Sequence, residues 1–202
     1  NDGSTMEVPV TWDTSAIDLS NISFQGVATY LIPGTAESNG SAMQVVCQLD
    51  IVEKNYIENP GFELSDLSMW NITNVDNKTT ELFVTEKVSD AASGTCSLHF
   101  YSTNNVEFIV EQTVSDLTAG TYNYNMTIHG GDAPTQEIVI YAIADGKTYE
   151  MPTSISSWRE FKTPKIEGIT TTDGTITIGI HVRCSSGAWG NLDDFLLAPV
   201  EE

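Results

Sequence analysis

The sequence predicts an all-β protein, and two observations about its apolar residues support this prediction. Short segments of alternating apolar and polar residues recur along the 202 residues, separated by turn signals such as Asp145-Gly146 and Asp173-Gly174. No segment keeps helical spacing of its apolar residues for more than a turn or two. Many short strands favour a β-sandwich or barrel. The expected strands are residues 6–12, 24–32, 42–51, 80–84, 96–101, 108–114, 121–128, 137–144, 175–184 and 192–197.

The first three of these strands indicate a small module of their own. Turn signals at Pro33-Gly34 and Asn39-Gly40 are expected to separate them, and residues 1–53 contain no Lys or Arg. Three or four strands make a thin, incomplete sandwich, whose strand edges remain exposed for pairing. We place the boundary at residues 54–58, which divides the chain into domains 1–53 and 54–202.

Two strands of the second domain alternate with a clear period of two. The segment from Ile176 to Cys184 has isoleucine and valine on one face, and Thr177, Gly179, His181 and Arg183 on the other. The segment from Tyr122 to His129 repeats this pattern with Asn123, Asn125, Thr127 and His129 on its polar face. Each strand therefore buries one face and shows the other to water or to a ligand.

The charge balance limits the partners of this protein. Its 28 acidic residues outnumber 8 basic ones, for a formal net charge of −20. Phosphate backbones and anionic lipid surfaces repel such a chain, which leaves neutral ligands or cations. The three cysteines, Cys47, Cys96 and Cys184, form no CxxC pair, and their odd count indicates free thiols or one disulfide with one free thiol.

Motifs of catalysis are missing. No serine lies in a GxSxG elbow, and His99, His129 and His181 have no HExxH or other transition-metal spacing. No pair of carboxylates flanked by aromatic residues suggests glycoside cleavage. We therefore expect a protein that is not an enzyme.

Two carboxylates near the C-terminus suggest a metal site. Side chains of neighbouring strand residues point to opposite faces, so Asp193 and Asp194 are not expected to converge, and one of them should turn inward beside Phe195. A buried bare carboxylate is unfavourable, and a hard cation such as calcium would stabilise it. Glu63, in the Asn-Pro-Gly-Phe-Glu segment at 59–63, offers a second carboxylate. The alternative is that Glu63 and Asp193 cap turns without a metal.

The tryptophans differ in their expected roles. Trp70 should lie in the core, whereas Trp158 stands at the edge of a loop and a strand and can be either buried or exposed. Trp189 lies between Gly187 and Gly190 with little local cover, so it is the best candidate to stack on the apolar face of a sugar. Galactose suits this pattern because its axial hydroxyl leaves one continuous apolar face.

The segment from Glu7 to Tyr30 resembles the latter part of bacterial immunoglobulin-like domains. Three pieces carry this resemblance: Val-Pro-Val-Thr-Trp at 8–12, Ile-Asp-Leu-Ser at 17–20, and Gly-Val-Ala-Thr-Tyr at 26–30. The opening strands of that family are missing, so the resemblance implies a partial immunoglobulin-like module.

The second domain resembles galactose-binding-like carbohydrate-binding modules, and more closely the β-1,4-galactan-binding modules of family sixty-one, which are appended to bacterial endo-galactanases. Residues 55–199 carry the likeness through Asn-Pro-Gly-Phe-Glu at 59–63, His-Gly-Gly-Asp-Ala at 129–133 and Trp-Gly-Asn-Leu-Asp-Asp-Phe at 189–195. The resemblance implies a two-sheet jelly roll with a structural calcium held by Glu63 and Asp193. It implies galactan binding by Trp189, with His129 and Asp132; Arg183 and Trp158 are added by inference rather than by a motif.

The function expected from these features is non-catalytic binding of β-1,4-galactan or a related galactose-containing polysaccharide. The parent protein would be a secreted or cell-surface bacterial glycoside hydrolase whose catalytic domain lies outside this chain. The alternative function is that of a calcium-stabilised β-sandwich that binds a protein in adhesion. A small lyase or hydrolase is a third possibility, which new reducing ends from pectic polymers would support.

Overall fold

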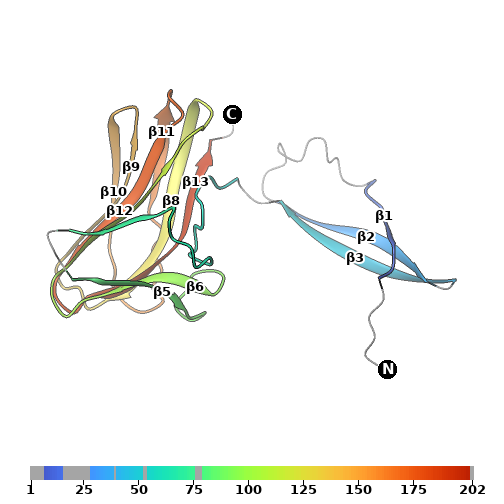
Figure 1. Ribbon diagram of the computed structural model, residues 1–202, viewed down its shortest axis with the longest axis horizontal. Helices are drawn as coiled ribbons and strands as arrows, with labels where there is room; N and C mark the ends of the chain where they lie inside the picture. Colours follow the sequence, from blue (N-terminus) through green and yellow to red (C-terminus); the bar gives the residue numbers. More distant parts are fainter. Residues whose placement is uncertain (1–6, 16–27, 39, 52–53, 76–78, 201–202) are drawn as a thin grey trace. The chain divides into compact units, whose positions relative to one another are not determined.

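The computed structural model describes residues 7–15, 28–38, 40–51, 54–75 and 79–200. The chain forms two compact units, residues 1–53 and 54–202 (Figure 1). All regular elements among the described residues are β-strands, so the predicted all-β class is confirmed. In the same residues, no helix is long and apolar enough to cross a membrane.

The first unit contains a three-stranded antiparallel sheet. Its strands are β1 (Val10–Trp12), β2 (Ala28–Ser38) and β3 (Ser41–Ile51), in the order β1-β2-β3. The β2–β3 hairpin pairs Ser38 with Ser41, as the Asn39-Gly40 turn signal predicts. The turn predicted at Pro33-Gly34 is wrong: both residues lie inside β2, where Pro33 O accepts a hydrogen bond from Asp13 N at 2.9 Å. The immunoglobulin-like resemblance of this unit stays a prediction.

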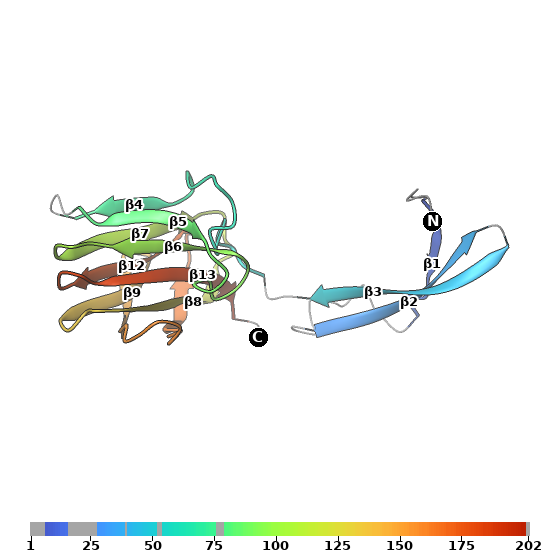
Figure 2. The same ribbon diagram turned by 90° about the horizontal axis from the view of Figure 1, so that it is seen from below.

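The second unit is a sandwich of two five-stranded sheets, shown as two layers in Figures 1 and 2. The first sheet has the order β10-β9-β12-β7-β4, and the second has the order β11-β8-β13-β6-β5. The strands are β4 (Asn71–Asn74), β5 (Glu81–Glu86), β6 (Cys96–Tyr101), β7 (Val106–Val114), β8 (Gly120–Gly131), β9 (Gln136–Ala144), β10 (Lys147–Thr153), β11 (Lys165–Thr171), β12 (Ile176–Cys184) and β13 (Trp189–Pro199).

The core lies between the two sheets, and the alternating strands supply it. Tyr124 and Ile128 of β8 are fully buried, as are Ile178 and Ile180 of β12. The hydroxyl of Tyr124 donates a hydrogen bond across the core to the Gly179 carbonyl oxygen at 3.2 Å. Each fully buried side chain of this size stabilises the fold by about 1.5–3 kcal/mol relative to an exposed one.

An aromatic cluster fills the end of the core next to the 59–63 segment. The ring centroid of Trp70 lies 5.3 Å from that of Phe62 and 4.8 Å from that of Phe195. Trp70 is 6% exposed, as predicted for a core residue. Phe62 and Trp70 lie near the start of the unit and Phe195 near its end, so this cluster holds the first and last parts of the unit together.

The two ends of the second unit are also joined by hydrogen bonds. Asn55 Nδ2 donates to Phe195 O at 2.7 Å, Asn55 Oδ1 accepts from Leu197 N, and Tyr56 N donates to Leu197 O. Phe195 N donates to Pro60 O at 3.1 Å. The head and tail of this sandwich therefore meet, and the 59–63 segment lies against β13.

Candidate sugar-binding face

The outer face of the sheet β11-β8-β13-β6-β5 carries most of the predicted site residues. Directly paired residues of antiparallel strands share a face. The register pairs Trp189 with Gly131 of β8 on one side and with Tyr101 of β6 on the other. Two positions further along, Asn191 is paired with both His129 and His99 in the same way. Two transverse rows of side chains therefore cross this face.

Trp189 lies across Gly131. A Cβ atom built on Gly131 would stand 3.3 Å from Cζ2 and 3.5 Å from both Cε2 and Nε1 of the indole. These nearly equal distances show that the ring covers the glycine, which has no side chain to lift it. Trp189 Nε1 donates a hydrogen bond to Asp132 Oδ2 at 2.9 Å, which fixes the orientation of the ring. The indole is partly exposed, and Asp132 is exposed.

His129 lies beside Trp189 but is only 1% exposed. Its Nε2 lies 2.9 Å from Asp90 O, which can only accept, and Arg159 N donates to its Nδ1 at 3.2 Å. The proton therefore sits on Nε2 of a neutral ring. Burial lowers the pKa of His129, which also favours the neutral form. The direct sugar contact predicted for His129 is corrected: the segments that carry Asp90 and Arg159 cover it, and it positions them.

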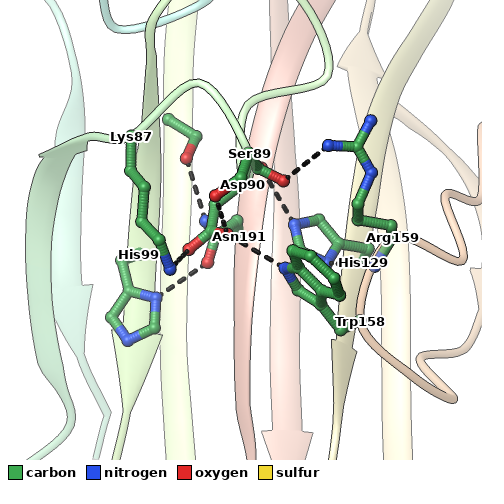
Figure 3. A network of polar contacts seen from close by, with 9 residues as sticks. Lys87, Ser89, Asp90, His99, His129, Trp158, Arg159 and Asn191 are labelled. Atoms are coloured by element: carbon green, nitrogen blue, oxygen red, sulfur yellow. Dashed lines mark hydrogen bonds and ion pairs between the residues drawn. The ribbon is translucent and has the colours of Figure 1, made fainter.

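Trp158 is on the same face and is 54% exposed. Its Nε1 donates to Asp90 Oδ1 at 2.9 Å, and Lys87 forms an ion pair with Asp90 Oδ2 at 2.8 Å, as Figure 3 shows. Burial alone would raise the pKa of Asp90, but the hydrogen bonds from Lys87, Trp158 and Ser89 outweigh it and lower that pKa. Asp90 is thus an ionised anchor that holds an exposed indole in place.

Arg159 follows Trp158 with a left-handed backbone, at φ 61°. Its Nη1 donates to Ser89 O at 3.0 Å, and its guanidinium carbon lies 5.8 Å from the centroids of both the Trp158 and the Phe161 rings. A non-glycine residue in this conformation is unfavourable and is often found at binding sites. The Asp90–Arg159 network was not predicted, because its contacts join residues 68 to 70 positions apart and no spacing in the sequence indicates them.

Arg183 does not join this group, which corrects its predicted place beside Trp189. It lies on β12, in the other sheet, and alternates with the buried Val182 and Cys184. Its side chain therefore points away from the core on the opposite side of the sandwich. There it forms ion pairs with Glu107 at 3.1 Å and with Glu137 at 2.6 Å.

The two carboxylates of β13 converge, contrary to the prediction from strand alternation. The pairing of β13 with β8 shifts register between Asp193 and Leu196, and Asp194 has a φ of 49°. This bulge interrupts the alternation, so both carboxylates reach the segment between β5 and β6. Ser93 Oγ donates to Asp194 Oδ1 at 2.5 Å, while the backbone N–H groups of Ala92 and Ser93 donate to Asp193 Oδ2 at 2.7 and 3.4 Å.

Asp193 is 2% exposed, but it is buried under the segment between β5 and β6 rather than in the core. Burial raises the pKa of Asp193 to about 7, and the charge of Asp194 adds to this effect. None of the ion pairs among the described residues involves Asp193, Asp194 or Glu63. A buried carboxylate without a cationic partner is the situation that a metal ion relieves.

Glu63 and Asp193 both approach Gly61. Both side chains surround Gly61: a Cβ atom built there would stand 3.2 Å from Asp193 Oδ1 and 3.8 Å from Glu63 Cγ. Glu63 Oε1 accepts from the N–H groups of Thr95 and Cys96 at 2.8 Å, which lowers the pKa of Glu63. Among the described residues, Glu63 Oε2 accepts from Thr95 Oγ1 and Asp193 Oδ1 accepts from Asp194 N, which leaves a lone pair of each oxygen without a partner in that part of the chain.

The donor set around Gly61 fits a hard cation with oxygen ligands. Within the described part of the chain, no three His, Cys, Asp or Glu side chains form a metal-binding group. Two carboxylate oxygens would therefore have to be completed by backbone carbonyls and water, which is usual for calcium. The three cysteines are free thiols, and Cys96 contributes its backbone N–H group to this site.

No protein-family model matches this sequence, and a search of curated proteins finds no match. Among solved structures, TmCBM61 in complex with β-1,4-galactotriose is 29% identical, with a TM-score of 0.66, and the match covers 73% of this chain and 99% of that one. The matched 73% of this chain is far more than residues 1–53 could supply, so most of the match lies in residues 54–202.

Two more distant structures share the fold. The CBM22-1 xylan-binding domain of Paenibacillus barcinonensis Xyn10C is 12% identical, with a TM-score of 0.50, over 70% of this chain and 92% of that one. A family 16 carbohydrate-binding module is 14% identical, with a TM-score of 0.51, over 73% of this chain and 100% of that one. At these identities the likeness concerns the architecture alone.

Proposed function

We propose, from the premise that residues 54–202 are a β-sandwich of the carbohydrate-binding-module type, that this unit binds β-1,4-galactan or a related galactose-containing polysaccharide without cleaving it. The match to TmCBM61 confirms the resemblance stated from the sequence, and β-1,4-galactotriose is the ligand of that protein. The proposal that this chain binds a ligand of the same kind rests on the geometry of the Trp189 face.

The observation that carries the proposal is the indole of Trp189 lying across Gly131. One face of the ring packs on the sheet, while the hydrogen bond from Nε1 to Asp132 prevents rotation, so the other face is a preorganised apolar surface. The C–H face of a galactose ring can stack there. The second oxygen of Asp132 and the exposed Arg159 are available to bind hydroxyl groups. A neutral sugar also suits a chain with a net charge of −20.

We propose further that calcium binds between Glu63 and Asp193 and has a structural role. Support comes from the approach of Asp193 Oδ1 and the Glu63 side chain to the same glycine, Gly61, and from the raised pKa of the buried Asp193 carboxyl. The ion would hold the segment between β5 and β6 against β13, and that segment carries Asp90. By joining these two segments, the ion would stabilise the fold.

The wider biological role belongs to the same proposal. A binding unit of this kind would bring a secreted bacterial glycoside hydrolase to its polymer and keep it there. Its support is the likeness to a galactan-binding module and the match to TmCBM61.

Isothermal titration with β-1,4-galacto-oligosaccharides tests the sugar-binding proposal. Trp189→Ala is expected to lower the affinity at least tenfold, because stacking on the indole is lost. Trp12→Ala is the matched control, since Trp12 is 42% exposed but belongs to the first unit, and it should bind like the wild type. The absence of heat with every galacto-oligosaccharide would refute the proposal. A protein partner that is captured equally well in free galactose would favour adhesion instead.

A further inference from the structure

Phe83 is an exposed aromatic residue on the same face as Trp189. It is 48% exposed on β5, and the register pairs it with His99 of β6, which is paired with Asn191 of β13. Phe83 therefore lies in the transverse row next to that of Trp189. From strand spacings of about 4.8 Å and a rise of about 3.3 Å per residue, the backbones of Phe83 and Trp189 are roughly 12 Å apart.

His99 presents a polar atom beside this ring. The centroids of Phe83 and His99 are 5.1 Å apart, with planes at 52°. Asn191 Nδ2 donates to Ser97 Oγ at 3.0 Å, so Asn191 Oδ1 accepts from His99 Nδ1 at 2.7 Å. This arrangement fixes the His99 ring and leaves Nε2 as an acceptor. His99 is partly exposed, so a ligand can reach that atom.

The pair combines the two features of a sugar subsite, which are an apolar ring face and a fixed hydrogen-bonding group. Tyr101 lies between the pair and Trp189, because the register pairs Tyr101 with both Trp189 and Glu81. It too is partly exposed. An oligosaccharide stacked on Trp189 and extending across β13, β6 and β5 would pass over Tyr101 and reach Phe83.

We propose that Phe83 and His99 form a second sugar subsite, which binds a later residue of the same β-1,4-linked galactan chain that stacks on Trp189. This inference rests on the proposed function of the Trp189 face. Its consequence is a binding site that runs across the strands and takes the interior of a polymer. Affinity should therefore increase with oligosaccharide length until Phe83 is reached.

The test compares galactobiose, galactotriose, galactotetraose and longer β-1,4-galacto-oligosaccharides by isothermal titration. Phe83→Ala should leave the affinity for the shortest bound oligosaccharide unchanged. It should lower the affinity for longer ones by about 3- to 10-fold, which removes the gain with length. Ile143→Ala is the matched control, because Ile143 is 41% exposed on β9 of the other sheet. Melting temperatures of Phe83→Ala and Ile143→Ala equal to that of the wild type would show that both variants fold.

His99→Ala provides a second readout. It removes the acceptor Nε2 together with the ring that packs against Phe83, and it should reduce the length-dependent gain as Phe83→Ala does. If Phe83→Ala and His99→Ala bind every length like the wild type while Trp189→Ala has lost binding, the second subsite is refuted and the proposed function stands. If the wild type binds no galacto-oligosaccharide, both are refuted.

Discussion

Replacement of Asp193 by asparagine should change how the stability of the second unit depends on pH. A carboxyl whose pKa is higher in the folded protein than in the unfolded chain holds its proton more tightly when folded. The stability that it contributes is therefore present at low pH and is lost as the pH rises through the window between the two values. For Asp193 this window runs from the ordinary value of 3.8 to about 7.

The size of the effect follows from the width of that window. Each pKa unit corresponds to 1.36 kcal/mol, so three units amount to about 4 kcal/mol of unfolding free energy lost between pH 4 and pH 7 in the absence of a cation. In Asp193→Asn this loss disappears. One of the N–H groups of Ala92 and Asp194 would then face an amide NH₂ group, which costs about 1–3 kcal/mol. At pH 4.5 the wild type has lost only about 1 kcal/mol of this stability, so we expect the variant to be less stable there, and as stable or more stable at pH 8.

Denaturant unfolding in a chelator, from pH 4.5 to 8, measures this crossover as the difference between the two proteins. The difference is needed because other groups titrate as well. The lowered pKa of His129 acts in the opposite direction, since stability is lost as the pH falls below 6.5. Calcium should stabilise the wild type at pH 8 and have a much smaller effect on Asp193→Asn. Parallel curves for the two proteins would refute the argument that the Asp193 carboxyl is buried without a cation.

Three further predictions concern single side chains. Gly131→Val should lift the indole of Trp189 from the sheet and lower galactan affinity about tenfold with little change in melting temperature, as titration and calorimetry would show; unchanged affinity would contradict the stacked geometry. Arg183→Ala should leave galactan affinity within twofold of the wild type, because Arg183 lies on the opposite side of the sandwich, and a large loss would contradict that placement. Burial raises the pKa of Cys184 to about 12, so Cys184→Ser should leave the number of thiols that react rapidly with a disulfide reagent at pH 8 unchanged.

Strand alternation was sufficient to predict most of the sandwich, but it failed where the backbone departs from a regular strand. The strands β4, β10 and β11 were not predicted, and the last two each have a local cause. Pro152 lies in β10, an edge strand where a missing N–H group is tolerated. In β11 the register shifts between Ile166 and Ile169, which hides the period of two. Conversely, Pro33-Gly34 suggests a turn, although β2 continues through it.

A site residue was predictable from the sequence where residues close to it in the chain determine its environment. Trp189 stands out because glycines flank it, and Glu63 and Asp193 because both occur in motifs at the ends of the unit. The burial of His129 was not predictable, since the segments that cover it come from residues 30 to 39 positions away. The convergence of Asp193 and Asp194 depends on a bulge, and adjacent aspartates alone do not indicate one.

The ion pairs of Arg183 with Glu107 and Glu137 have a consequence at the scale of the polymer. Those charges satisfy one another on the side of the sandwich away from Trp189, so the Arg183 guanidinium is already engaged and does not offer a second polysaccharide its donors. A protein that binds galactan through the Trp189 face alone attaches to one polysaccharide molecule and does not cross-link two. Mixing it with soluble galactan should thus coat the polymer without gelling or precipitating it, and an attached enzyme would remain free to move with respect to neighbouring chains.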